Sequence, residues 1–213
     1  MRSFVIANGT SRSGFDLNIL SSFGKTYGCN ALYRDFTPDY IGGIDRPMID
    51  EMVRESAWQN STMICKHMYP GSFDPFPRAK LYVKTFKQAL GYDKHYDTGQ
   101  TMLDYASQHL QEGEIYMLGF DLTNYIEQSQ RNIDNKIDNI YAGTDCYASL
   151  DAAEKYCGKW INEMKEIFSL NSKIKYYRVV EDKYYSPEWD YPNFRHITYQ
   201  ELYRLITTWP KNV

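Results

Sequence analysis

Residues 4–17, FVIANGTSRSGFDL, join a short apolar run to a loop that carries Gly9 and Gly14. An apolar run that ends in Asn-Gly is typical of a buried strand followed by a turn. The spacing of the two glycines matches the first half of a G-x-x-x-x-G-K-S/T phosphate-binding loop. Phe15 and Asp16, however, stand where that loop has its lysine and hydroxyl residue. The stretch therefore predicts a strand-end loop that meets a nucleotide without a lysine.

Strand-like and helical stretches alternate along the rest of the chain. Apolar patterns and turn signals predict strands at residues 3–7, 26–30, 40–45, 62–65, 114–118 and 173–180. They predict helices at residues 15–20, 46–58, 98–110, 150–170 and 199–207, while residues 79–90 fit either state and residues 123–147 read as a long polar loop. This alternation predicts an α/β fold with a mainly parallel sheet. Ligands of such sheets bind at the carboxyl ends of the strands.

Composition places the chain among globular proteins. Its 213 residues, 43% of them hydrophobic, predict a single domain at 1–213 with a Tyr- and Trp-rich C-terminal extension over about residues 181–213. The net charge of −3, without a large basic run, argues against nucleic acid as a partner. Four cysteines without a C-x-x-C pair argue against a zinc site. With no signal peptide and no apolar stretch near the length of a membrane span, we expect a soluble, cytoplasmic protein. The sequence is consistent with either a monomer or an oligomer.

Small or amide-bearing residues lie where predicted strands end or helices begin. They are Asn8, Gly9, Thr10, Ser11, Asn30, Thr98, Gly99, Gly119 and Asp121. An asparagine side chain both donates and accepts hydrogen bonds, so it can contact ribose hydroxyls and base edges. A glycine beside a helix N-terminus offers backbone N–H groups to a phosphate. These residues therefore predict a nucleotide pocket that requires no lysine.

The order of these motifs resembles that of the bacterial sialyltransferases that build lipooligosaccharide from CMP-activated sugar. In that family the first strand runs into Asn-Gly-Pro-Ser and the second ends in Cys-Asn; here the residues are Asn8-Gly9-Thr10-Ser11 and Cys29-Asn30. A later helix of the family begins Thr-Ser-Gly and the next strand ends Gly-Ile-Asp-Phe; here they are Asp97-Thr98-Gly99 and Gly119-Phe120-Asp121-Leu122. The resemblance spans about residues 3–170. It implies a Rossmann-like three-layer sandwich and sugar transfer without a metal ion.

The resemblance also implies which residues line the nucleotide pocket: Asn8, Gly9, Ser11, Asn30, Thr98, Gly99 and Gly119. The family uses a histidine base in the loop after Gly-Ile-Asp, whereas residues 139–149 contain no histidine. Asp145 is one candidate base, because a carboxylate can accept a hydroxyl proton, although a loop aspartate can equally shape its loop. His95, just before the Asp97 motif, is the other candidate, unless it is an ordinary surface histidine.

Two charged residues are each consistent with either a ligand-binding or a structural role. Arg12, inside the first loop, is either the cation nearest the expected phosphates or a solvated loop residue. Asp45 ends the third strand and either contacts the ligand or caps the helix that follows. Asp45 and Asp121 are also the acidic residues that a metal-dependent enzyme would use. The same nucleotide-binding half of the fold also occurs in proteins similar to the archaeal 6-hydroxymethylpterin diphosphokinases.

Three functions are consistent with these residues. The first is a metal-independent glycosyltransferase that moves a sugar from a nucleotide donor, with a CMP-sugar favoured, to an unknown hydroxyl of a glycan or other acceptor. It would need no cofactor besides the donor. The second is a nucleotide-binding protein of the same fold without transferase activity. The third is a metal-dependent diphosphokinase.

Overall fold

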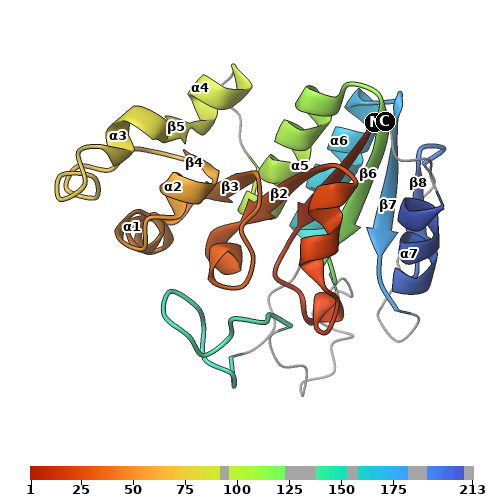
Figure 1. Cartoon of the computed structure of the whole chain (residues 1–213), viewed down its shortest axis with the longest axis horizontal. Coiled ribbons are helices and arrows are strands. Elements are labelled where there is room, and N and C mark those ends of the chain that lie inside the picture. The colour runs from red at the N-terminus through yellow and green to blue at the C-terminus, as the bar shows by residue number, and fades with distance from the viewer. Residues whose placement is uncertain (92–95, 123–137, 153–157, 182–190, 209–213) are drawn as a thin grey trace.

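The computed structural model describes residues 1–91, 96–122, 138–152, 158–181 and 191–208 (Figure 1). Within them, eight strands form one sheet in the order β5-β4-β3-β2-β1-β6-β7-β8, and every neighbouring pair is parallel. The strands are β1 (Arg2–Ile6), β2 (Lys25–Cys29), β3 (Tyr40–Gly43), β4 (Thr62–Cys65), β5 (Lys84–Thr85), β6 (Gly113–Leu118), β7 (Ile174–Val179) and β8 (Phe194–Ile197). The prediction of an α/β fold with a mainly parallel sheet is therefore confirmed.

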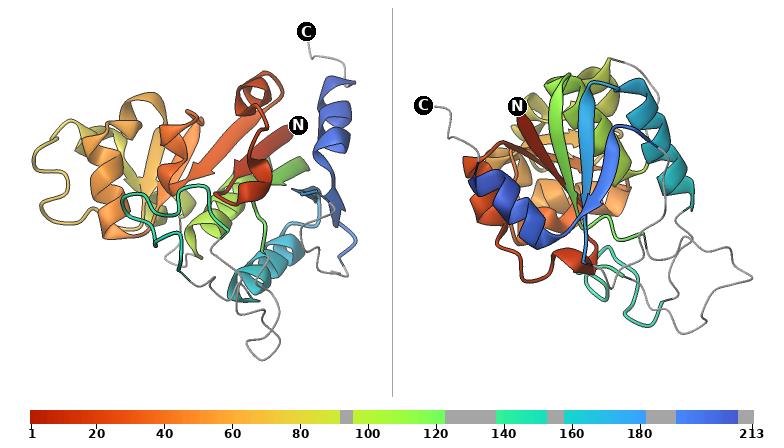
Figure 2. Two further views of the ribbon diagram at one scale, coloured as in Figure 1. Left: turned by 90° about the horizontal axis from the view of Figure 1, so that it is seen from below. Right: turned by 90° about the vertical axis from the view of Figure 1, so that its right-hand side faces the viewer.

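Helices cover both faces of the sheet (Figure 2). Successive side chains of a strand point to opposite faces, so Phe4 and Ile6 of β1 belong to one buried cluster and Val5 to the other. The first cluster includes α1 (Arg46–Arg54), α2 (Ala57–Asn60), α3 (Ala79–Tyr82), α7 (Tyr199–Thr207) and the 3-10 helices η2 (Leu17–Ser22) and η3 (Asn30–Arg34). The second includes α4 (Phe86–Leu90), α5 (Thr98–Leu110) and α6 (Gly158–Leu170). The fold is a three-layer sandwich.

The sequence explains the limits and the buried faces of two helices. In α5, the apolar residues Met102, Ala106 and Leu110 recur at helical spacing and are buried. In α7, the hydroxyl of Thr198 accepts a hydrogen bond from Glu201 N, and the Glu201 carboxylate accepts one from Thr198 N. This reciprocal pair is a capping box, which satisfies two N–H groups at the start of the helix.

Three segments differ from the sequence prediction. The helix expected at 46–58 is divided by Ser56, whose left-handed φ of 61° separates α1 from α2. The helix expected from residue 150 is a turn at 150–152 and is helical, within the described residues, from Gly158. β8 is not predicted from the sequence, because Arg195 and His196 interrupt its apolar pattern.

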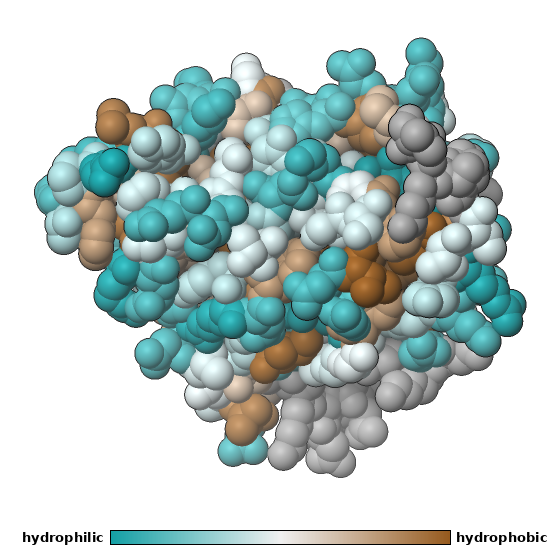
Figure 3. Space-filling model, in the orientation of Figure 1, coloured by the Kyte–Doolittle hydropathy of each residue, from teal (hydrophilic) through white to brown (hydrophobic). Residues whose placement is uncertain are grey.

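Apolar side chains on the surface are scattered. Figure 3 shows one face of the molecule, on which hydrophobic residues form small patches between hydrophilic ones. Leu81, Tyr82 and Leu150 are among the exposed large apolar side chains, and single residues of this kind are normal for a protein surface. No helix in the described part of the chain has the length and apolar character needed to cross a membrane.

The strand order reverses at β1. The chain builds β2 to β5 on one side of β1 and then returns to place β6 on the other side. The loops that follow β1 and β6 touch, since Gly9 N donates to Gly119 O at 2.9 Å and Ala7 N donates to Leu118 O at 2.8 Å. Gly119 has a φ of +69°, which a glycine adopts without strain. A crevice at such a reversal is where open parallel sheets bind their ligands.

Candidate functional site

A cavity of about 370 Å³ opens at this reversal, beside the carboxyl ends of β1, β2, β3 and β6. The N-terminus of α5 and residues 138–139 and 146–148 also contribute to its lining. The structure brings eight of the predicted site residues together there: Asn8, Gly9, Asn30, Asp45, Thr98, Gly99, Gly119 and Asp121. These residues come from five separate segments of the sequence, which converge on one cavity.

Thr10 and Ser11 do not line the cavity but hold two aspartates that do. They belong to the short 3-10 helix η1 (Thr10–Arg12) that follows β1. Thr10 donates from its N–H at 3.2 Å, and from its hydroxyl, to Asp138. Ser11 donates from its N–H at 2.8 Å, and from its hydroxyl, to Asp121. These two consecutive residues therefore fix the positions of Asp138 and Asp121 at the cavity.

Arg12 points into the protein interior. Its side chain is 5% exposed, and its guanidinium donates to Ala7 O at 2.8 Å and to the Tyr141 hydroxyl at 2.9 Å. The Asp35 carboxylate lies 3.6 Å from Arg12 Nη2. Arg12 is thus neither solvated nor among the residues that line the cavity, and the interpretation of Arg12 as a phosphate-binding cation finds no support in its placement.

Of the two candidate bases, the structure describes Asp145, which does not line the cavity. Asp145 borders a second, more open hollow, and its backbone oxygen accepts a hydrogen bond from Arg34 Nη2 at 3.1 Å. Its neighbours Cys146 and Tyr147 line the cavity instead. His95 lies outside the described residues, so its proposed role stays a prediction.

Four aspartates, and no lysine or arginine, occur among the described residues that line the cavity. They are Asp45, Asp97, Asp121 and Asp138. Besides the two held by η1, Asp97 accepts hydrogen bonds from Trp160 Nε1 at 2.6 Å and from Lys159 Nζ at 3.0 Å. Sequence reasoning missed Asp138, because nothing local distinguishes it within the polar stretch 123–147. It also passed over Asp97, which it treated only as part of a helix-start motif.

Asp45 differs from the other three aspartates. It lies two residues after the end of β3 and occupies the N-cap position of α1, but its side chain makes no capping hydrogen bond. Its carboxylate is exposed and accepts no hydrogen bond from any residue of the described chain. Asp45 is therefore the cavity carboxylate with free capacity to accept a proton or a hydrogen bond.

Asp121 is a buried carboxylate with a raised pKa. Its side chain is 3% exposed, and burial, followed by the neighbouring Asp138 carboxylate, raises its pKa to about 6. The hydrogen bonds from Ser11 act in the opposite direction. Desolvation dominates because a buried carboxylate loses more hydration than a few hydrogen bonds restore.

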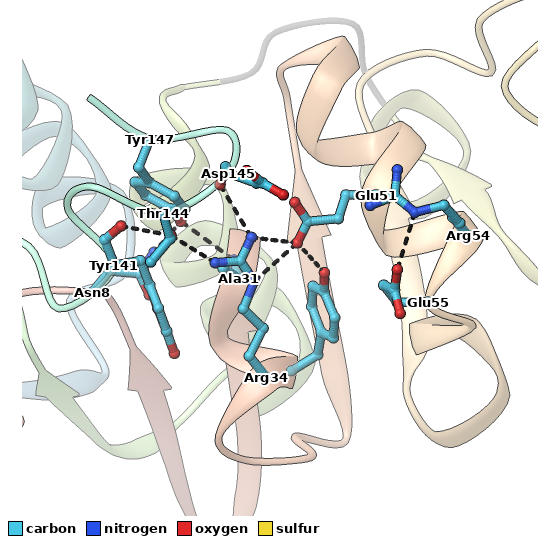
Figure 4. A network of polar contacts seen from close by, with 11 residues as sticks. Asn8, Ala31, Arg34, Glu51, Arg54, Glu55, Tyr141, Thr144, Asp145 and Tyr147 are labelled. Atoms are coloured by element: carbon cyan, nitrogen blue, oxygen red, sulfur yellow. Dashed lines mark hydrogen bonds and ion pairs between the residues drawn. The ribbon is translucent and has the colours of Figure 1, made fainter. Parts of the chain in front are cut away.

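Two amide side chains in the cavity have buried acceptor atoms without partners. The Oδ1 atoms of Asn8 and Asn30 are both buried and accept no hydrogen bond from the described residues. Asn8 Nδ2 donates to the Tyr147 hydroxyl at 2.9 Å, and Ala31 N donates to the same hydroxyl at 3.3 Å (Figure 4). Buried acceptors are nearly always paired, and an unpaired one carries a desolvation cost. A ligand that offers donors would pair both atoms.

The first turn of α5 offers hydrogen-bond donors to the same cavity. Thr98, Gly99 and Gln100 line it, and the Asp97 side chain at the N-cap position makes no capping hydrogen bond. The first N–H groups of a helix have no partner within the helix, and the helix dipole favours an anion beside them. The cavity therefore combines N–H donors for an anionic group with free acceptors for hydroxyl or amine groups.

The described residues contain no group of three or more His, Cys, Asp or Glu side chains placed to hold a metal ion. Asp45 and Asp121, the pair expected for a metal-dependent diphosphokinase, do line one cavity. Asp121, however, is already held by Ser11.

Comparison with known proteins supports the fold. A point variant of the sialyltransferase CST-II, solved in complex with CMP, matches with a TM-score of 0.50 and 14% sequence identity, over 95% of this chain and 97% of that one. The sialyltransferase CstII from Campylobacter jejuni, in complex with the substrate analogue CMP-3FNeuAc, matches with a TM-score of 0.47 and 14% identity, over 100% and 99% of the two chains. No protein-family model and no curated protein sequence matches this chain. The chain has a sialyltransferase-like fold, as its strand-end motifs predicted.

Proposed function

We propose that this protein is a glycosyltransferase that moves a sugar from a nucleotide donor, with a CMP-sugar favoured, to a hydroxyl of a glycan or other acceptor. The observation that carries the proposal is the pair of buried, unpaired oxygens of Asn8 and Asn30 in one cavity at the strand reversal. Ribose hydroxyls and the amino group of cytosine are donors that would pair them. The first turn of α5 adds N–H groups for the phosphate.

The charge of the cavity favours a donor with a single phosphate. Four aspartates and no cation are found among its described lining residues. Like charges repel more strongly in a partly desolvated site than in water, so each additional phosphate charge would weaken binding. A nucleoside monophosphate leaving group suits these surroundings better than a diphosphate would in the absence of a metal ion.

Transfer requires a group that accepts the proton of the acceptor hydroxyl. In the proposed reaction the acceptor oxygen bonds to the anomeric carbon of the sugar while its proton passes to a carboxylate. The bond from that carbon to the phosphate oxygen breaks, and its electron pair leaves with CMP. Asp45 is the favoured base among the described residues, because its carboxylate lines the cavity without a hydrogen-bond partner there.

Thermal unfolding in the presence of nucleotides tests the proposal. CMP, UDP, GDP and ATP are each added with and without magnesium, and a ligand that binds the folded state raises Tm. We expect the largest shift with CMP, and the same shift with and without magnesium. A shift with ATP and magnesium alone would favour the diphosphokinase. If CMP binds but a CMP-sugar releases no CMP in the presence of the protein, the chain is a nucleotide-binding protein without transferase activity.

Removal of either amide that carries an unpaired oxygen should weaken CMP binding. Asn8→Ala and Asn30→Ala each remove one hydrogen bond to the ligand, which corresponds to about tenfold in Kd. Isothermal titration calorimetry measures this change. Asn18→Ala is the matched control, because Asn18 is exposed and, among the described residues, its amide group contacts the side chain of Asp16 alone. Wild-type affinity in both Asn8→Ala and Asn30→Ala would remove the basis of the proposal.

A further inference from the structure

Arg34 borders the second hollow, as Asp145 does, and joins three parts of the molecule. It ends η3, four residues after Asn30. Its Nε and Nη2 donate to Glu51 Oε1 of α1 at 2.9 and 2.5 Å. Its Nη1 donates to the Thr144 hydroxyl at 2.7 Å, and its Nη2 to Asp145 O at 3.1 Å (Figure 4). One guanidinium thus ties α1 and η3 to residues 139–148, which we call the wall loop.

Glu51 gives Arg34 a fixed anchor. Glu51 is 3% exposed, and the Tyr33 hydroxyl donates to the same oxygen that Arg34 contacts. Burial acts to raise the pKa of Glu51, but the hydrogen bonds from Tyr33 and Arg34 outweigh it and hold the pKa below its usual value. A buried carboxylate that stays ionised holds its partner strongly, because removal of the partner leaves an uncompensated charge.

The wall loop forms one side of the cavity. Cys146, Tyr147 and Ala148 line it directly after the two residues that Arg34 contacts. The Tyr147 hydroxyl accepts hydrogen bonds from Asn8 Nδ2 and Ala31 N. The donor end of the Asn8 amide is therefore occupied by the wall loop, whereas its acceptor end has no partner among the described residues.

We propose that Arg34 is a positioning residue which, anchored on Glu51, holds the wall loop so that Tyr147 orients the Asn8 amide toward a donor group of the ligand. This inference rests on the proposed function, since it concerns the same nucleotide cavity. Arg34 itself does not line that cavity. Its effect reaches Asn8 along the wall loop, from Asp145 through Cys146 to Tyr147, whose hydroxyl contacts the Asn8 amide. A ligand group that can only accept hydrogen bonds would face the wrong end of the amide.

A purely structural ion pair would have a different signature. If Arg34 only stabilised the fold, its replacement would lower Tm but leave the affinity for CMP unchanged at a temperature well below Tm. If Arg34 positions the wall loop, its replacement also increases local opening of residues 139–148 and weakens ligand binding. Hydrogen–deuterium exchange reports this local opening separately from global unfolding.

The test compares Arg34→Ala with Arg54→Ala. In Arg34→Ala we expect hydrogen exchange in residues 139–148 to rise at least tenfold without nucleotide, and the Kd for CMP to rise about tenfold. Arg54 is the matched control: it borders the same hollow, is 59% exposed and pairs with Glu55. Arg54→Ala should change both quantities less than twofold.

A second variant keeps the test decisive if Arg34→Ala does not fold. Thr144→Val removes the hydroxyl that accepts a hydrogen bond from Arg34 Nη1, while the Arg34–Glu51 pair remains. Because the same hydroxyl donates to Tyr141 O within the wall loop, Thr144→Ser, which keeps a hydroxyl for both bonds, is its control. Thr144→Val should raise exchange of the wall loop and the Kd in the same direction, by about threefold or more. Unchanged loop exchange and Kd in the folded variants would overturn the inference. If the wild-type protein does not bind CMP, the proposed function fails, while loop exchange still decides whether Arg34 anchors the wall loop.

Discussion

Gly9→Ala should abolish CMP binding and lower the free energy of unfolding by about 2 kcal/mol or more. A Cβ at position 9 would lie 2.5 Å from Asp121 Oδ2 and 2.6 Å from Gly119 O. Neither neighbour can move easily, because Ser11 holds Asp121 and Gly9 N itself donates to Gly119 O. The added methyl group would therefore force apart the loops after β1 and β6, between which the cavity opens. Urea unfolding and calorimetric titration with CMP measure the two effects.

Gly99→Ala is the matched control for this change. Gly99 lines the same cavity, but a Cβ there would have its nearest neighbour, a ring carbon of Phe120, at 3.5 Å. This is an ordinary van der Waals contact, and alanine favours a helix over glycine by up to about 1 kcal/mol. Gly99→Ala should therefore keep or raise the stability. A Gly9→Ala protein with wild-type stability and affinity would show that the two loops do not need this close contact.

Arg178→Met should destabilise the protein by about 3 kcal/mol or more, because it leaves buried polar groups without their partner. Arg178 is fully buried on β7. Its Nε donates to Phe120 O at 2.6 Å, and its Nη2 donates to Asp121 O. Both carbonyls belong to the loop that follows β6. Loss of the guanidinium should therefore disturb the cavity as well as the core.

The destabilisation caused by Arg178→Met should increase with pH. Burial raises the pKa of Asp121 to about 6, above its ordinary value of 3.8, and the charge of Arg178 acts against that rise. Asp121 therefore favours the folded state less as pH rises from about 4 to about 6. Without Arg178, ionised Asp121 loses a compensating charge. The loss in the free energy of unfolding caused by Arg178→Met should therefore be largest above pH 6 and become smaller toward pH 4. Urea unfolding at pH 4.5 and pH 7.5 measures both proteins.

Arg195→Met is the control for Arg178→Met. Arg195 lies on the adjacent strand β8, where it is exposed and its guanidinium lies 4.8 Å from the centre of the Tyr177 ring. An exposed contact of this kind contributes about 1 kcal/mol or less. Arg195→Met should show a small loss that does not depend on pH between 4.5 and 7.5. Equal losses in the two variants would contradict the role given to the buried guanidinium.

The sequence could predict the fold because its strands are marked locally. Short apolar runs that end in Asn-Gly or Gly identify β1 and β6, and helical spacing identifies α5. The local pattern does not identify a strand whose apolar run is interrupted by polar residues, as Arg195 and His196 interrupt that of β8. It also fails at Ser56, where a single left-handed residue divides one predicted helix into α1 and α2.

The structure brings to the cavity the predicted residues that a strand positions, and not the predicted side chains whose direction depends on distant partners. Asn8, Asn30 and Asp45 follow strands, so the sheet itself carries them to one edge. Arg12 is close to Asn8 in sequence, but its guanidinium points inward, where it donates to Ala7 O and to the Tyr141 hydroxyl. Asp145 lies within the predicted loop, yet Arg34 holds its backbone oxygen while the next residues line the cavity. Such long-range contacts leave no local signal in a single sequence.

The reversal of strand order also determines when the cavity can form during folding. β1 meets β2 after a short connection, but in its pairing with β6 the partners Arg2 and Glu114 are 112 residues apart. Contacts between residues so distant in sequence form slowly. A nascent chain folded only through β5 would hold Asn8 and Asn30 but lack Gly119 and the acidic residue that follows. A ligand in this cavity would therefore stabilise the completed sheet, but not the half of the sheet, β1 to β5, that is synthesised first.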